Sequence, residues 1–240
     1  MSNLKQIYTW IRKQKKKQKI IIKEKNISKL DLWKCKSDRI NHNSKKFFSI
    51  VGLRVISNFY KYYTWDQPLI YQNENGILGI VRRNKNGEPE YLMQAKVEPG
   101  NINKLQISPT VQATKSNYKR VHGGKKIQFL NFFLNKTKCL VNSKQTEQGF
   151  RYLFKKNTNI LLNVNRNINF SKNHKWISKK HLISMVKKKN ILNIAKFRQY
   201  LLDNKIYYPT SGIIFLSDST SYKSINYVLN HIKIGLKKNF

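Results

Sequence analysis

Acidic residues are scarce in this 240-residue sequence: 11 Asp and Glu stand against 48 Lys and Arg, which gives a formal net charge of +37. Proline (5), glycine (10) and cysteine (2) are also few. Cys35 and Cys139 are too few for a disulfide framework and lack the spacing of a zinc site. No hydrophobic run approaches the roughly 18 residues of a membrane span. Apolar residues still make up 40% of the chain, so we expect a globular, cytoplasmic protein with no membrane contact.

The excess of positive charge has two interpretations. Basic residues interleaved with aromatic ones are typical of proteins that bind RNA through its phosphates. The chain is also crowded with Lys, Asn and Ile, the residues that an A/T-rich genome favours through its codons. Composition alone does not favour either interpretation over the other.

The distribution of the charge separates them. Residues 5–25 carry nine basic side chains against Glu24 alone, as expected of a basic extension that is helical or frayed. Residues 65–112 hold five basic and five acidic side chains, so this stretch has no net charge. Most of the glycine and proline residues lie there or just beyond it, and such residues mark turns. A nucleic-acid binder concentrates positive charge on its working surface, so the neutral stretch disfavours that class.

Hydrophobic periodicity predicts an α+β domain. Asn86-Gly87 is a hairpin turn signal between two apolar strands. Ser178 is placed to cap a short helix that carries Leu182, Ile183 and Val186 as its apolar stripe. Strands are expected at 47–56, 77–83, 90–96, 127–133 and 160–164, and helices at 145–155, 178–188 and 193–203.

The neutral stretch and the residues after it carry a recognisable motif block. Its segments are YLMQAKVEPGN at 91–101, QISPTVQATKSNY at 106–118 and VHGG at 121–124. Together they closely resemble the NDP-hexose 2,3-dehydratase family of deoxysugar biosynthesis. The resemblance extends over about residues 30–200, through His42 with KFFSIVG at 46–52, WDQPLI at 65–70, GILG at 76–79, TEQG at 146–149 and WIS at 176–178.

The resemblance implies a fold and an activity. The implied fold is a Nudix-like mixed β-sheet flanked by helices, without the glutamate-rich Nudix motif that holds metal. The implied reaction is the dehydration of an NDP-4-keto-6-deoxyhexose across C2 and C3, with no cofactor and no metal. The implied substrate is a nucleotide sugar, with dTDP as the nucleotide. The expected organisation is a basic extension at 1–29, the dehydratase-like domain at 30–205 and a C-terminal segment at 206–240.

Family members have about twice this length and two related halves, whereas this chain holds one copy. We therefore expect a homodimer, which would restore the pair. The alternative is a non-catalytic module that binds nucleotide sugars or serves as a dimer partner. A nucleic-acid-binding protein that acts through residues 1–25 ranks last.

Such a reaction needs a base, an acid and a donor to the enolate oxygen. Glu98 is the expected base because Pro99-Gly100 forms a rigid turn behind it and no other acid lies between Glu90 and Glu147. Its alternative role is an ion pair with Lys96. His122 could act as acid or base near neutral pH, or be a surface histidine. Tyr118 could donate to the leaving hydroxyl or the enolate, or serve in packing.

Substrate binding needs cations for the diphosphate, an aromatic ring for the base and polar side chains for the sugar. Lys115 and Arg120 suit the diphosphate, and Trp65 suits the base, although a core position for Trp65 is equally open. The further expected substrate-binding residues are Gln94, Lys96, Asn101, Gln112, Thr114 and Asn117.

Overall fold

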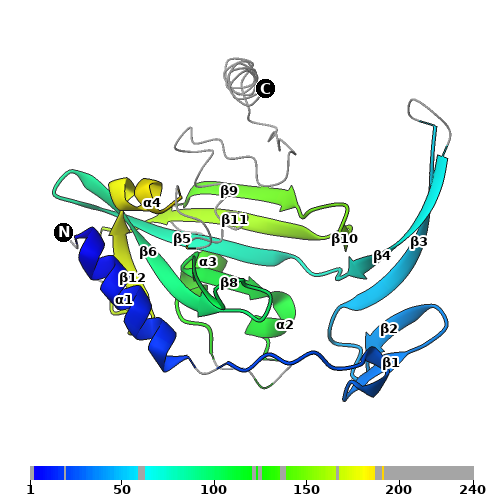
Figure 1. The fold of residues 1–240 in the computed structure, drawn as a ribbon. Helices are drawn as coiled ribbons and strands as arrows, with labels where there is room; N and C mark the ends of the chain where they lie inside the picture. The colour runs from blue at the N-terminus through cyan, green and yellow to red at the C-terminus, as the bar shows by residue number, and fades with distance from the viewer. Residues whose placement is uncertain are drawn as a thin grey trace, which may run out of the picture. The chain divides into compact units, whose positions relative to one another are not determined.

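The computed structural model in Figure 1 describes residues 3–18, 20–58, 63–120, 123, 126–135, 139–165, 168–186 and 191. All of them belong to one compact unit, residues 1–193. The expected helix at 193–203 and the segment at 206–240 lie outside the described residues. The expected boundaries at residues 30 and 205 stay predictions.

Two β-sheets contain all the strands of the described chain. The smaller has the order β1 (Trp33–Cys35), β2 (Arg39–His42), β3 (Ser49–Ser57), β4 (Tyr63–Tyr71) and β10 (Tyr152–Leu153). The larger has the order β12 (His174–Ser178), β6 (Glu88–Val97), β5 (Gly76–Lys85), β11 (Lys156–Asn163) and β9 (Cys139–Thr146), with β7 (Leu105–Ser108) on β6 and β8 (Val111–Thr114) on β5.

The sheets are mixed, because β11 runs parallel to β5 and β10 parallel to β4, while the other pairs are antiparallel. The described helices are few and short: α1 (Leu4–Lys17), the 3₁₀ turn η1 (Ile27–Lys29), α2 (Lys115–Tyr118), α3 (Leu130–Leu134) and α4 (Lys179–Val186). The expected α+β class is confirmed. The expected strands at 47–56, 77–83, 90–96 and 160–164 correspond to β3, β5, β6 and β11.

The hairpin between β5 and β6 forms at the predicted turn. Asn86 and Gly87 both have left-handed backbone angles, with φ of 52° and 80°. This pair of angles is what a two-residue hairpin turn requires, and Asn and Gly tolerate it best. The predicted connection is confirmed.

The larger sheet divides beyond this hairpin. Strand β6 pairs with β5 only from Glu88 to Leu92, and its second half pairs with β7 instead. Strand β8 occupies the place beside β5 that β6 has left. Thr110 lies at the branch point, where its hydroxyl accepts a hydrogen bond from the Val81 amide (2.9 Å) and donates one to the Leu92 carbonyl. One hydroxyl therefore joins the two strand pairs where they part.

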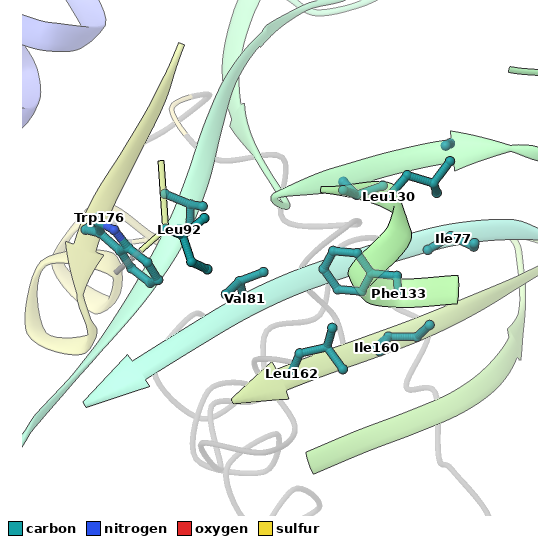
Figure 2. Close-up of a cluster of buried hydrophobic side chains, with 11 residues drawn as sticks. Ile77, Val81, Leu92, Leu130, Phe133, Ile160, Leu162 and Trp176 are labelled. Atoms are coloured by element: carbon teal, nitrogen blue, oxygen red, sulfur yellow. The ribbon is translucent and has the colours of Figure 1, made fainter. Parts of the chain in front are cut away.

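The main core lies on one face of the larger sheet and is covered by α3 (Figure 2). Phe133 of α3 is fully buried, and a Cβ added at Gly79 of β5 would overlap its ring. The expected strand at 127–133 is wrong. Phe129 takes a left-handed conformation (φ 66°) and starts a helical turn, which places Leu130 and Phe133 on its buried side.

The expected helix at 145–155 is also wrong. Residues 145 and 146 end β9, a turn follows, residues 152 and 153 form β10, and residues 154 and 155 lead into β11. Phe150 and Phe154, four residues apart as on one face of a helix, are 45% and 77% exposed. Their helical spacing is coincidental, because β9 and β11 are paired neighbours and the segment connects them.

The helices at the two ends of the described chain are both packed. Helix α1 buries Ile7 completely, and Trp10 and Gln14 donate hydrogen bonds to the carbonyl of Lys172 (3.0 and 2.8 Å). Helix α4 packs against β12 and β6, and Ser178 accepts a hydrogen bond from the amide of His181, as predicted for its cap. The end of this predicted helix, at 187–188, lies outside the described residues.

Candidate functional site

Glu98 lies where β6 ends, on one side of the division in the sheet. Its Oε1 accepts a hydrogen bond from Nε2 of Gln112 on β8 (2.9 Å) and lies 3.4 Å from Nζ of Lys96. The side chains of Glu98 and Lys96 are 24% and 27% exposed. The contact with Gln112 also joins the two strand pairs a second time, because Glu98 follows β6 and Gln112 belongs to β8.

Two buried polar atoms on β7 and β8 have no hydrogen-bond partner among the residues that the structure describes. They are Oγ of Ser108, a fully buried residue of β7, and Oε1 of Gln112, the amide oxygen of the side chain that binds Glu98. Buried polar atoms are almost always hydrogen-bonded, to water or a ligand if not to protein. The division in the sheet therefore holds polar groups suited to a polar ligand.

A second group of polar side chains surrounds Glu74. Its carboxylate accepts hydrogen bonds from the amide and the hydroxyl of Ser116 (3.2 and 2.8 Å), and that hydroxyl also contacts Thr114 (3.0 Å). The backbone carbonyl of Glu74 accepts a hydrogen bond from Nζ of Lys155 (2.6 Å). This group lies at the end of β8, two residues beyond Gln112.

Lys155 is a buried cation, only 5% exposed. Burial lowers the pKa of its ammonium group, and the nearby carboxylates of Glu74 and Glu147 partly oppose that shift. Glu147 accepts a hydrogen bond from Asn157, whose side chain lies against Gly76. A buried lysine is uncommon unless carboxylates surround it, as they do here.

Tyr152 connects the two groups. Burial raises the pKa of its phenol, the negative charge of Glu147 raises it further, Arg151 opposes this, and the charge of Glu98 adds a smaller increase. Because the pKa is raised, the phenol stays protonated at neutral pH and can donate a hydrogen bond. We call Glu98, Gln112, Tyr152, Glu147 and Lys155 the Glu98 site.

The structure gathers some of the residues that the sequence predicted. Lys96 and Gln112 both contact Glu98, and the backbone amide of Asn101 donates to the Glu98 carbonyl (3.1 Å). Thr114 belongs to the Glu74 group through Ser116. Gln94 lies opposite Ser108 in the pairing of β6 with β7.

Other predicted residues lie elsewhere. Trp65 is in the smaller sheet, 38% exposed, and its indole donates to Gln67 (2.9 Å). Tyr118 packs against the main core, the alternative left open above. Lys115, Asn117 and Arg120 are exposed on α2 and the turn after it. His122 lies outside the described residues.

Sequence reasoning missed the remaining members of the site. Glu147 stood in the motif TEQG, and Glu74 was one of five acids in the neutral stretch, so both could have been singled out. Lys155 is one of 48 basic residues, and nothing in its sequence context marks it as buried. Ser108 and Tyr152 likewise give no signal before the strands are paired.

The described residues contain neither a metal-binding cluster nor a membrane-spanning helix. No three His, Cys, Asp or Glu side chains in these parts of the chain are placed to hold one metal ion. None of the helices in the same parts is long and apolar enough to cross a membrane.

Comparison with known proteins gives one family match. The sequence profile described as NDP-hexose 2,3-dehydratase matches residues 4–201. A dTDP-4-dehydro-6-deoxy-alpha-D-glucopyranose 2,3-dehydratase from Streptomyces violaceoruber is 39% identical over 161 residues, which are 66% of this chain and 36% of that protein. Proteins of the same name from Saccharopolyspora spinosa and Amycolatopsis orientalis are each 36% identical, over 69% and 64% of this chain and 35% and 34% of their own lengths. The chain thus spans about a third of the length of these curated relatives.

Nudix hydrolases are among the solved structures that overlap with it. An ADP compounds hydrolase aligns with a TM-score of 0.39 and 7% identity over 67% of this chain and 89% of its own. An Ap4A hydrolase from C. elegans aligns with a TM-score of 0.29 and 14% identity over 54% of this chain and 99% of its own. These values mark a partial likeness of fold and say nothing about activity.

Proposed function

Since this chain belongs to the NDP-hexose 2,3-dehydratase family, we propose that it removes water across C2 and C3 of an NDP-4-keto-6-deoxyhexose, most simply a dTDP-linked one. The observation that carries the proposal is the position of Glu98. It lies in the family's motif block, at the division in the sheet, with its carboxylate held by Lys96 and Gln112.

The reaction needs no change of oxidation state. The C3 proton is acidified by the C4 ketone, so a base can remove it to give an enolate. The C2 hydroxyl then leaves and takes up a proton to become water. The resulting C2–C3 enol gains a proton at C2 and loses the proton of its C3 hydroxyl, so the product is a 3,4-diketo-2,6-dideoxy sugar nucleotide. The protein has to supply a base, a proton for the leaving hydroxyl and a donor to the developing enolate oxygen.

We assign the base to Glu98. Its contacts with Lys96 and Gln112 favour the ionised form, which is the form that accepts a proton. The phenol of Tyr152, whose pKa is raised chiefly by burial, stays protonated at neutral pH and suits the donor. Oε1 of Gln112 and Oγ of Ser108 lack partners among the described residues and suit sugar hydroxyls.

The diphosphate needs cations that are not already in use. Lys96 is close to Glu98, and Lys155 is buried against the Glu74 carbonyl. Lys115 and Arg120 are exposed on α2 and the turn after it, which follow directly from β8 of the site. We therefore keep these two as the diphosphate ligands.

We also propose a homodimer, in which a second copy of this chain supplies the counterpart of the other half that the family resemblance implies; this chain matches about a third of the length of its first curated relative. The expected compartment is the cytoplasm, because the chain has only two cysteines, Cys35 and Cys139, too few for a disulfide framework.

The decisive experiment is turnover of dTDP-4-keto-6-deoxyglucose by the purified full chain, followed by mass spectrometry for the loss of one water. Glu98→Gln should lower kcat by about 10²- to 10⁴-fold, which is typical for a lost general base. Glu88→Gln, an exposed acid at the start of the same strand, is the matched control and should keep the wild-type rate. Full activity of Glu98→Gln would remove Glu98 as the base.

A second function is favoured by length, since the chain spans 36% of the first curated relative. A single copy could bind the sugar nucleotide without converting it. Calorimetry with thymidine diphosphate and light scattering for the size separate the two. Binding by a confirmed dimer without any turnover would establish the non-catalytic function.

A further inference from the structure

A groove with a volume of about 960 Å³ lies between α1 and the strands β5, β6 and β12, away from the Glu98 site. Glu90, an acid in the lining of the groove, is eight residues before Glu98 on the same extended strand, which corresponds to about 26 Å between the two residues. The groove therefore offers a binding surface that the proposed dehydration does not use.

The charge of this groove is strongly positive. Six lysines line it: Lys5, Lys13, Lys17, Lys85, Lys172 and Lys175. None of the six makes an ion pair with a carboxylate in the described part of the chain. The carboxylate of Glu90, which also lines the groove, is already paired with Arg83 at 2.7 Å. The six lysines thus lack an anionic partner among the described residues.

The basic groove is a formed feature rather than a row of lysines on a frayed extension. Helix α1 is fixed through the buried Ile7 and through Trp10 and Gln14, which both bind the Lys172 carbonyl. Lys13 and Lys17 are four residues apart on this helix and thus on one side of it. Lys172 lies on the opposite side of the groove, and its carbonyl accepts these two hydrogen bonds.

The spacing of the cations distinguishes between possible anions. Lys5 and Lys17 are twelve residues apart on α1, or about 18 Å. The two phosphates of a nucleoside diphosphate are adjacent and could occupy only part of such a row, whereas the phosphates of a nucleic-acid strand follow one another along it. Phe170, 43% exposed, and Trp10 add aromatic rings to the lining, on which bases can stack.

We propose that the basic groove binds single-stranded nucleic acid, through phosphate contacts to its lysines and base stacking on Phe170. From the sequence, the neutral stretch disfavoured nucleic-acid binding. The packing of α1 supports it, because this packing places the basic residues on a shaped surface apart from the neutral motif block.

The test measures binding of a fluorescein-labelled 12-nucleotide RNA to the full chain by anisotropy at several salt concentrations. The groove variant Lys13→Gln/Lys17→Gln/Lys172→Gln removes three cations of the lining. Each lost phosphate contact reduces the salt slope by about 0.7, so the slope should fall by about 2 and the affinity at 0.1 M salt on the order of 100-fold. The control Lys15→Gln/Lys16→Gln/Lys180→Gln removes three exposed lysines outside the groove and should keep most of the affinity.

Phe170→Ala is a second variant that leaves the charge unchanged, and it should weaken binding roughly tenfold with an unchanged salt slope. Equal losses in the groove and control variants would overturn the proposal, because binding would then follow net charge alone. Absence of salt-dependent RNA binding would overturn it as well. Displacement of the RNA by equimolar thymidine diphosphate would reassign the groove to the sugar nucleotide. None of these outcomes bears on turnover, which is assayed separately.

Discussion

Replacing Gly79 by alanine tests the packing of α3 on the larger sheet. A Cβ at this position would overlap the ring of Phe133, and even Cζ, the third nearest ring atom, would lie only 2.6 Å away. Ordinary contact begins at about 3.4 Å, so the fully buried ring would have to move by at least about 0.8 Å. Overpacking of this kind costs about 1–3 kcal/mol, partly offset by the roughly 0.5–1 kcal/mol that alanine gains over glycine in a strand.

We therefore expect Gly79→Ala to lower the free energy of unfolding by about 1–2 kcal/mol, and the melting temperature by about 2–8 °C for a domain of this size. The assay is urea unfolding followed by tryptophan fluorescence, with thermal melts by circular dichroism. Gly52→Ala is the matched control, because Gly52 is also in a strand and a Cβ there meets nothing within 4 Å. It should be neutral or slightly stabilising.

A double variant identifies Phe133 as the cause. Phe133→Leu costs stability alone, but in the Gly79→Ala background its smaller side chain relieves the overlap. The two changes should therefore be non-additive by at least about 0.5 kcal/mol. If Gly79→Ala is as stable as Gly52→Ala, or if the two changes add, Phe133 does not lie on Gly79 and the placement of α3 is wrong.

Three further predictions concern single contacts. Glu90→Gln leaves the partly buried Arg83 without its ion partner and should cost about 3 kcal/mol in urea unfolding, whereas a cost below about 1 kcal/mol would mean that the pair is solvated. Because burial lowers the pKa of Lys155, the unfolded chain binds more protons between that pKa and the ordinary value of 10.5, so stability should rise with pH in this window. Lys155→Met should remove that rise, and identical pH profiles of variant and wild type would contradict it. Gly87→Ala should cost about 1–2 kcal/mol from backbone strain alone, since φ is 80° and no atom lies within 4 Å of the new Cβ; an unchanged midpoint of unfolding would refute this.

Local signals in the sequence were sufficient wherever the structure is decided locally. The left-handed pair Asn86-Gly87 and the cap at Ser178 depend on neighbouring residues, and both were predicted correctly. The segments 127–133 and 145–155 were assigned wrongly because distant partners decide them. Phe133 is placed by a contact with Gly79, and residues 145–155 by the pairing of β9 with β11.

The candidate site divides in the same way. The motif block contained Lys96, Glu98 and Gln112, and Glu98 contacts both of the others although Gln112 is fourteen residues away. Lys155 and Tyr152 enter the site only because β10 and β11 return to β4 and β5 as parallel partners. No local pattern encodes a parallel pairing across about 80 residues, so these side chains could be found only in the structure.

The hydrogen bond from Gln112 to Glu98 has a consequence for substrate recognition. The side-chain amide of Gln112 donates to the Glu98 carboxylate from across the division in the sheet, much as a sugar hydroxyl would. A substrate that enters there exchanges one hydrogen bond for another, so its affinity depends on the difference between the two and not on the full strength of the new one. Gln112 thus orients Glu98, the proposed base, and only a ligand that offers a better donor than a glutamine amide would displace it.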